Sequence, residues 1–249
     1  QTRLLKAQMI NFVGDNRLIL RVDRIEPSKN ILRGLEAYRS LLEHHPELAG
    51  RVQMLALLVP SRIEVDEYQS YLREIMAEAG LINARYSDEL WEPVRIVVGD
   101  NYHRAIAAMQ FYDVLLVNPI ADGMNLVAKE GVLVNQRNGV LVLSEYAGAF
   151  YELGEQALVV SPFDTYSTMQ AMYEALTMPP DERRARAEIL RERVRNAGVR
   201  EWFQAQVDDA LRVLSSQESS DSTPSTPSAN RSALSTTGSG VESDRTPTP

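Results

Sequence analysis

The 249-residue sequence contains no cysteine, which excludes disulfide bonds, thiolate metal sites and cysteine nucleophiles. It also lacks any apolar run of the roughly 18 to 20 residues that a helix needs to cross a bilayer, and its first residues show no signal-peptide pattern. We therefore predict a cytoplasmic protein that has no membrane as a partner.

Basic residues are fewer than acidic ones, 26 against 34, which gives a formal net charge of -8. A protein that neutralises a nucleic-acid backbone needs a basic face, so nucleic acid is not an expected partner. His44, His45 and His103 lack the spacing of metal ligands, and we predict no metal site. The motifs of dinucleotide-binding, phosphate-loop and serine-hydrolase sites, Gly-x-Gly-x-x-Gly and Gly-x-Ser-x-Gly among them, are also missing.

What the sequence does contain is a series of short apolar runs, rich in Val and Leu, that alternate with longer helical patterns. Several of these runs are apolar on both faces, which is typical of parallel strands covered by helices. The pattern predicts an α/β protein with a Rossmann-like, doubly wound parallel sheet. The expected strands are Leu18–Val22, Val52–Val59, Val94–Val98, Val114–Val117, Val140–Leu143 and Ala157–Val160, and the expected helices include Asn30–His44, Tyr68–Ala79, Asn125–Asn135 and Asp181–Asn196.

The two ends of the chain differ from this pattern. Residues 215–249 are mostly Ser, Thr and Pro with few large apolar side chains, so we predict a disordered tail there and a single domain over residues 1–214. Residues 1–11 resemble a helix entered midway. We therefore expect the chain to be a fragment that lacks an N-terminal Rossmann-like domain, with ligands bound between the two domains.

Two cations follow the first predicted strand and precede a helix. Arg24 ends the strand, and Lys29 lies just before the helix that starts near Asn30. Because ligands bind at the carboxyl ends of parallel strands, where helix N-termini add positive charge, this pair suits a diphosphate. Two solvated surface charges would give the same pattern, and spacing alone leaves both interpretations open.

The fourth strand leads into a Pro, an Asp-Gly turn at Asp122 and Gly123, and then a helix. Such a turn would leave backbone amides around Gly123 to Leu126 pointing into the cleft, where they could bind sugar hydroxyls or phosphate oxygens. Glu130 follows two turns into the helix, on a face that a ribose could reach. The alternative is an ordinary strand–turn–helix connection capped by Asp122. A third segment, Ser144–Ala149, offers small residues that permit close approach, and packing is the simpler explanation for them.

Together these segments resemble the C-terminal half of trehalose-6-phosphate synthases, a family of retaining glycosyltransferases with the two-domain GT-B fold. The resemblance extends from about Leu18 to Leu211, and its most specific element is Asp122-Gly-Met-Asn-Leu-Val-Ala-Lys-Glu130. The other matching segments occur in the family's order: Val22–Arg24 with Lys29, Val59–Arg62, Gly139–Ser144, Ala147–Ala149, Glu152–Leu153 and Ala175–Pro179. The resemblance implies the C-terminal, sugar-donor-binding domain of a GT-B enzyme.

The resemblance also implies roles for particular residues. Arg24 and Lys29 match a cationic pair that holds the diphosphate and stabilises the leaving nucleoside diphosphate, and Asp122 matches an acidic catalytic residue beside the donor sugar. The remaining matches are the amides of Gly123, Met124 and Asn125 for sugar hydroxyls, those of Leu126 and Val127 for the diphosphate, Glu130 for the ribose and Arg62 for the acceptor phosphate. Arginine, lysine and helix amides replace a metal in such enzymes, so no cofactor or metal is expected.

The activity implied is transfer of glucose, with retention, from UDP-, GDP- or ADP-glucose to a sugar phosphate, giving trehalose 6-phosphate or a close analogue. The loop Arg24–Asn30 departs from the family's usual Arg-Leu-Asp-Tyr-x-Lys-Gly, so a glucosylglycerol-phosphate synthase or a cyclitol pseudo-glycosyltransferase stays an alternative. A non-catalytic sugar-nucleotide-binding or regulatory module is the alternative from another class. A homo-oligomer is compatible with the sequence, which does not give the number of copies.

Overall fold

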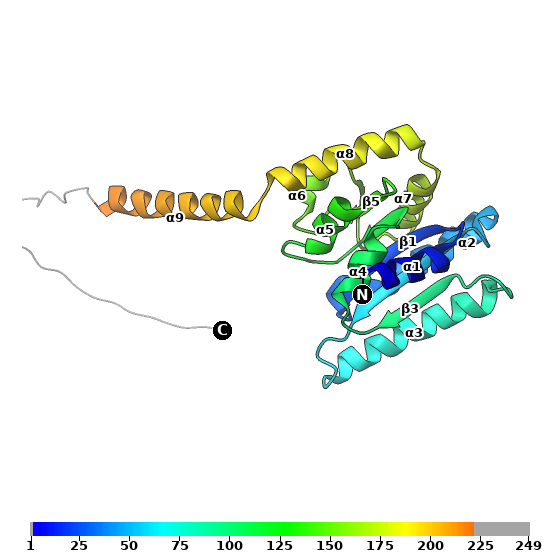
Figure 1. Ribbon diagram of the computed structural model, residues 1–249. Helices are drawn as coiled ribbons and strands as arrows, with labels where there is room; N and C mark the ends of the chain where they lie inside the picture. The colour runs from blue at the N-terminus through cyan, green and yellow to red at the C-terminus, as the bar shows by residue number, and fades with distance from the viewer. Residues whose placement is uncertain (1, 222–249) are drawn as a thin grey trace, which may run out of the picture. The chain divides into compact units, whose positions relative to one another are not determined.

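The computed structural model describes residues 2–221 of the chain (Figure 1). It divides into two compact units, Gln1–Gly198 and Val199–Pro249. The described part of the second unit is one helix, α9 (Val199–Asp221), whose exposed apolar side chains include Trp202 and Phe203.

The domain boundary predicted between residues 214 and 215 lies inside α9. The helix continues past residue 214 because the Ser-, Gln- and Glu-containing stretch that follows has no helix breaker, and the first proline after it is Pro224. The compact α/β unit correspondingly ends earlier than predicted, at Gly198. Residues 222–249, which make up the rest of the predicted tail, lie outside the described residues.

The first unit is built on a six-stranded sheet in the order β3-β2-β1-β4-β5-β6, in which every pairing is parallel. This is the strand order of the Rossmann fold, in which the direction of winding reverses between β1 and β4. Strands β2, β4 and β5 are buried almost throughout, as expected of parallel strands covered on both faces. The strands are β1 (Arg17–Arg24), β2 (Val52–Val59), β3 (Val94–Val98), β4 (Val114–Val117), β5 (Val140–Ser144) and β6 (Leu158–Val160).

Helices cover both faces of this sheet, and each face has its own apolar core. One core contains side chains of α2 (Ile31–His44), α3 (Asp66–Tyr86) and α7 (Thr165–Thr177). The other contains side chains of α1 (Thr2–Val13), α4 (Tyr102–Met109), α5 (Leu126–Val134), α6 (Phe150–Leu153) and α8 (Pro180–Asn196). Figure 1 shows α3 beside β3 at one end of this unit and α8 at the other. None of the helices described in residues 2–221 combines the length and the apolar character that a membrane span requires.

The doubly wound α/β fold predicted from the sequence is therefore confirmed, and all six predicted strands are present. The bounds of β2, β3 and β4 agree with the predicted ones, whereas α3 is longer than the predicted helix at both ends. Helices α4 and α7 were not predicted. Each is capped by a side chain before its first residue, Asn101 for α4 and Asp164 for α7, and this is a signal that the sequence offered.

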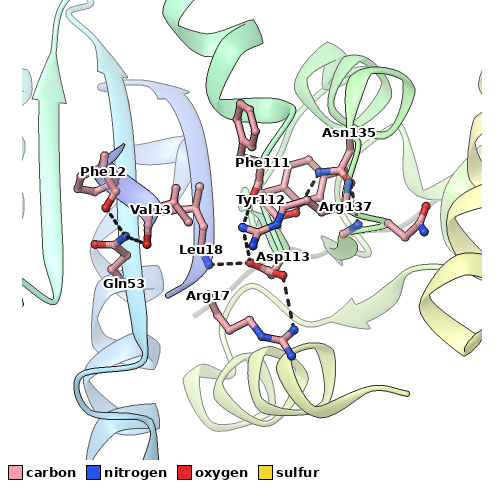
Figure 2. Close-up of polar contacts among 12 residues, drawn as sticks. Phe12, Val13, Arg17, Leu18, Gln53, Phe111, Tyr112, Asp113, Asn135 and Arg137 are labelled. Carbon is pink, nitrogen blue, oxygen red and sulfur yellow. Dashed lines mark hydrogen bonds and ion pairs between the residues drawn. The ribbon is translucent and has the colours of Figure 1, made fainter. Parts of the chain in front are cut away.

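Asp113 connects the amino ends of β1 and β4, the two central strands (Figure 2). It lies just before β4 and is only 3% exposed, and its carboxylate accepts a hydrogen bond of 3.0 Å from the Leu18 N–H at the start of β1. Arg17, Arg137 and Arg183 form ion pairs with the same carboxylate at 3.5, 3.3 and 3.2 Å. These bonds fix the amino ends of β1 and β4. The cavity described below lies at the other end of the same two strands, where they terminate.

Candidate functional site

A cavity of about 500 Å³ opens at the carboxyl ends of β1 and β4. It lies at the point where the winding of the sheet reverses, which is where open α/β sheets bind their ligands. Its lining residues come from the ends of β1 and β2, from the loop after β1, and from the loop and first turn that follow β4: Val22, Asp23, Arg24, Lys29, Val59, Asp122, Met124, Asn125, Leu126 and Val127.

The loop after β1 places Lys29 in this cavity. A short 3-10 turn, η1 (Pro27–Lys29), begins at Pro27, and Asn30 then adopts a left-handed backbone with φ 58°. The buried Asn30 side chain donates hydrogen bonds to the carbonyls of Asn118, at 3.0 Å, and Pro162, at 2.7 Å. These bonds tie the loop after β1 to the loops after β4 and β6, so the position of Lys29 depends on three strand ends.

Asp122 lies opposite Lys29, on the loop that follows β4. The Lys29 ammonium contacts the Asp122 carboxylate, and the Asn125 side-chain amide donates to the same carboxylate oxygen at 3.0 Å. Burial alone would raise the pKa of the Asp122 carboxyl, but the hydrogen bond and the charge of Lys29, helped by Asn125 and the Met124 amide, bring that pKa below its ordinary value of 3.8. Asp122 is therefore ionised at neutral pH.

Asn125 caps the N-terminus of helix α5, which faces the cavity. Its backbone is left-handed, with φ 62°, and its side-chain oxygen accepts a hydrogen bond of 3.0 Å from the Ala128 N–H. The cap of α5 is therefore Asn125 and not Asp122, which corrects the alternative considered from the sequence. The N–H groups of Leu126 and Val127 belong to the first turn, which has no intrahelical acceptors for them, and both residues line the cavity. The positive end of the helix dipole thus faces the cavity.

The segment Ser144–Ala149 supports the loop that carries Asp122. The Asp122 N–H donates to the Tyr146 carbonyl at 3.2 Å, and the Gly148 N–H donates to the Asp122 carbonyl at 2.8 Å. A Cβ atom at Gly148 would lie 1.9 Å from the Gly123 carbonyl oxygen. The small residues predicted at this position therefore allow one loop to pack against another, which agrees with the packing explanation.

Arg24 reaches the cavity from the end of β1, and its side chain is 60% exposed. Its guanidinium forms an ion pair of 2.8 Å with Glu26, whose carboxylate also accepts a hydrogen bond of 2.9 Å from the Ser61 hydroxyl. Five N–H groups on the guanidinium leave Arg24 able to bind a ligand oxygen while it keeps Glu26.

Three of the predicted site residues lie outside the cavity lining. Gly123 is exposed on the loop after β4, and Glu130 lies in the second turn of α5. Arg62 has a left-handed backbone, φ 46°, and its guanidinium donates to the Tyr68 hydroxyl at 3.1 Å, at the start of α3. The cavity thus brings together Arg24, Lys29, Asp122, Met124, Asn125, Leu126 and Val127.

Val22, Asp23 and Val59 line the same cavity but were not among the predicted site residues. Burial raises the pKa of the Asp23 carboxyl, and the Arg21 guanidinium opposes that rise. A carboxylate at the end of an apolar strand was a signal for Asp23 in the sequence. Val22 and Val59 gave no such signal, because apolar residues fill most positions of buried strands.

The charges of the site suit an anionic ligand better than a cation. Arg24, Lys29 and the N-terminus of α5 converge on the cavity, whose two acidic side chains, Asp23 and Asp122, are paired with Arg21 and Lys29. Within residues 2–221, no cluster of three or more His, Asp or Glu side chains is placed to hold a metal ion. Phosphate oxygens are the ligand atoms that such an arrangement binds.

Comparison with known protein families shows which family the chain belongs to. The profile of glycosyltransferase family 20 matches residues 3–212. The chain belongs to glycosyltransferase family 20. The cavity with Arg24 and Lys29 at and after the end of β1, and with the Asp122-Gly-Met-Asn segment after β4, therefore lies in a family 20 domain.

One curated relative and two solved structures show what the chain is similar to. The trehalose-6-phosphate synthase of Sodalis glossinidius is 36% identical over 208 residues, which are 82% of this chain and 44% of that protein. The crystal structure of an alpha,alpha-trehalose-phosphate synthase (UDP-forming) from Burkholderia xenovorans in complex with glucose-6-phosphate has a TM-score of 0.78 at 33% identity, over 82% of this chain and 45% of the other. An E. coli structure bound with UDP-2-fluoro glucose has a TM-score of 0.77 at 30% identity, over 84% and 49%.

The chain spans about half the length of the family 20 proteins that it matches. The likeness to those structures confirms the α/β fold, and it agrees with the resemblance to trehalose-6-phosphate synthases.

Proposed function

We propose that this domain binds the nucleoside diphosphate of a sugar donor in the cavity between β1 and β4. In the complete enzyme it would transfer glucose from UDP-glucose to glucose 6-phosphate, with retention at the anomeric carbon, and form trehalose 6-phosphate. The observation that carries this proposal is the convergence of Arg24, Lys29 and the α5 N-terminus on one cavity in a member of glycosyltransferase family 20.

The chemistry of sugar transfer requires positive charge where the leaving group forms. As the bond between the sugar and the diphosphate breaks, negative charge grows on the diphosphate, and groups already fixed beside it lower the barrier. Lys29 and Arg24 would supply two such charges. The N–H groups of Leu126 and Val127 would add hydrogen bonds at the end of the helix dipole.

The other residues have roles around this diphosphate. Asp122 would lie beside the donor sugar, where its carboxylate stays ionised, and the amides of Gly123, Met124 and Asn125 would bind the sugar hydroxyls. Glu130 would accept hydrogen bonds from the ribose, and Arg62 would reach the acceptor phosphate. Since Glu130 and Arg62 lie outside the cavity lining, their roles need the donor and the acceptor to extend beyond it.

A metal ion is not needed in this scheme, because Lys29, Arg24 and the helix amides provide the charge that a divalent cation would otherwise supply. The proposal includes an N-terminal Rossmann-like domain that contributes the rest of the acceptor pocket. This is in keeping with the share of its relatives that the chain spans. The choice of uracil as the base follows the UDP-forming relatives. Cytoplasmic location stays a prediction from the cysteine-free sequence.

Calorimetric titration with UDP, GDP and ADP and with their glucose conjugates tests the proposal. We expect UDP and UDP-glucose to bind, with an affinity that EDTA does not change and that the Lys29→Ala variant loses. A coupled assay for UDP release, with glucose 6-phosphate and an added N-terminal half, then separates a transferase from a non-catalytic binding module. Failure of all three nucleotides to bind a chain that is folded by circular dichroism would reject the sugar-donor site.

A further inference from the structure

Arg21 is a fully buried arginine that lies directly beneath the loop carrying Lys29. It follows Ile19 on the face of β1 that α2 covers, and its relative exposure is 0%. A buried guanidinium is costly unless its N–H groups have acceptors, so the groups that accept from Arg21 show what its charge is used for.

Two of those acceptors are backbone carbonyls of the cationic loop and of the helix that follows it. The Arg21 Nη2 group donates to the Lys29 carbonyl at 3.1 Å, and Nη1 donates to the Ile31 carbonyl at 3.2 Å. The third acceptor is Asp23, whose Oδ2 receives Nε at 3.1 Å and Nη2 at 2.9 Å. Asp23 itself lines the cavity, so this one side chain connects the cavity wall, Lys29 and the start of α2.

The neighbouring helix is shaped to admit the guanidinium. Gly34 lies in the first turns of α2, and a Cβ atom built on it would come within 2.2 Å of Arg21 Nη1. Glycine in a helix is less stable than alanine, and here it provides the space that Arg21 occupies. Arg21 and Gly34 therefore form a matched pair.

We infer that Arg21 is a positioning residue for the sugar-donor site, which holds the backbone of Lys29 so that its ammonium meets Asp122 and the diphosphate. The inference rests on the proposed function. Lys29 has a long, flexible side chain, and fixing its carbonyl reduces the number of places that its ammonium can reach.

Substitution of both members of the pair tests this role by calorimetric titration of the whole chain with UDP. We expect Arg21→Met to raise the Kd for UDP about tenfold, because Lys29 loses its anchor. Arg21→Lys, which keeps the charge but cannot bridge two carbonyls and a carboxylate, should have a smaller effect. Gly34→Ala should raise the Kd as Arg21→Met does, and the double variant should bind no more weakly than the weaker of the two single variants, because both changes remove the same contact.

Arg183 provides the matched control. It is also a buried arginine, bonded to a carboxylate, Asp113, and to the Asn138 carbonyl, but it lies at the opposite edge of the sheet. Arg183→Met should lower Tm and leave the Kd within about twofold of the wild type, since no contact joins it to the loop of Lys29. An equal loss of affinity in Arg183→Met would mean that general destabilisation explains the Arg21 result, and it would overturn the inference.

Hydrogen exchange over residues 25–31 separates failure of the inference from failure of the proposed function. If the wild-type chain binds no UDP but Gly34→Ala and Arg21→Lys exchange faster over these residues, the donor site is rejected and the loop-holding role of Arg21 is kept. If the wild-type chain binds UDP and the folded Arg21→Lys and Gly34→Ala variants keep both its Kd and its exchange rates, the inference alone is overturned. Arg21→Met is not required for either outcome if it fails to fold.

Discussion

Lys29 and Asp122 form an ion pair across the winding point of the sheet, between the loop after β1 and the loop after β4. Their side chains are 13% and 15% exposed, so the pair is largely shielded from solvent. A cation proposed for the diphosphate and a carboxylate proposed for the donor sugar thus hold each other in place.

Replacement of Lys29 by methionine should weaken UDP binding by about 1.5 to 3 kcal/mol, the range for a charged hydrogen bond. Lys129→Met is the control, because Lys129 is similarly buried and also contacts a carboxylate, that of Glu152, outside the cavity lining. Calorimetry with UDP compares the two. Equal affinity in Lys29→Met and Lys129→Met would contradict the assignment of Lys29 to the diphosphate.

The same pair predicts how stability depends on pH. The pKa of Asp122 is lowered in the folded chain, so its ionised form adds stability above the unfolded value near 3.8, and this contribution is lost as the pH falls through the folded pKa. The difference in unfolding free energy between the wild type and Asp122→Asn should therefore be constant above about pH 5 and shrink below about pH 4. Urea titrations from pH 3 to pH 7 measure it. A difference that stayed constant down to pH 3 would show that folding does not lower the pKa of Asp122.

Removal of Lys29 should reverse the shift. Burial is the largest influence on Asp122 and acts to raise its pKa, and the Lys29 ammonium is what outweighs it. In Lys29→Met the carboxyl pKa of Asp122 should accordingly rise above its value in the wild type, as followed by NMR of the side-chain carboxyl carbon. An unchanged pKa would mean that Asn125 and the Met124 amide are sufficient.

Much of the fold could be predicted from the sequence because buried parallel strands are apolar along their whole length. The runs Val52–Val59 and Val114–Val117 agree with β2 and β4, since few other structures bury such runs on both faces. Helix α7 was missed because its apolar positions, such as Met169 and Met172, stand among Ser, Thr and Gln residues that weaken the pattern. Its Asp164 cap was the more informative feature.

The contacts within the site could be predicted less well, because they depend on how loops from distant strands approach one another. Strand-end reasoning placed Arg24, Lys29 and Asp122 near one ligand, but it could not show that Lys29 pairs with Asp122 or that Arg24 pairs with Glu26. The burial of Arg21 could not be predicted either. An arginine in a strand is expected at the surface, and only the packing of α2 shows that this one is buried.

Gly148 should be intolerant of any side chain. A Cβ there would meet the Gly123 carbonyl oxygen at 1.9 Å and the Met124 Cα at 3.1 Å, and both atoms belong to the backbone. Gly148→Ala should therefore destabilise the domain by about 1 to 3 kcal/mol and displace the loop of Asp122, with weaker UDP binding as a result. Gly80→Ala is the control, because Gly80 lies in α3 with no atom within 4 Å of the added Cβ, and it should stabilise by about 0.5 to 1 kcal/mol. Similar changes in Tm for the two variants would refute the close approach.

Asn30 combines a backbone requirement with a side-chain requirement, and two substitutions separate them. Its left-handed φ of 58° costs an alanine about 1 to 2 kcal/mol but costs a glycine nothing, whereas both substitutions remove the bonds to the Asn118 and Pro162 carbonyls. Asn30→Ala should therefore lower the unfolding free energy more than Asn30→Gly does, by about 1 kcal/mol, and Asn30→Gly should itself be less stable than the wild type because two buried carbonyls lose their donor. Urea denaturation of the three chains measures both differences. If Asn30→Gly were as stable as the wild type, the side-chain bonds would contribute nothing, and the loop of Lys29 would be held by its backbone and Arg21 alone.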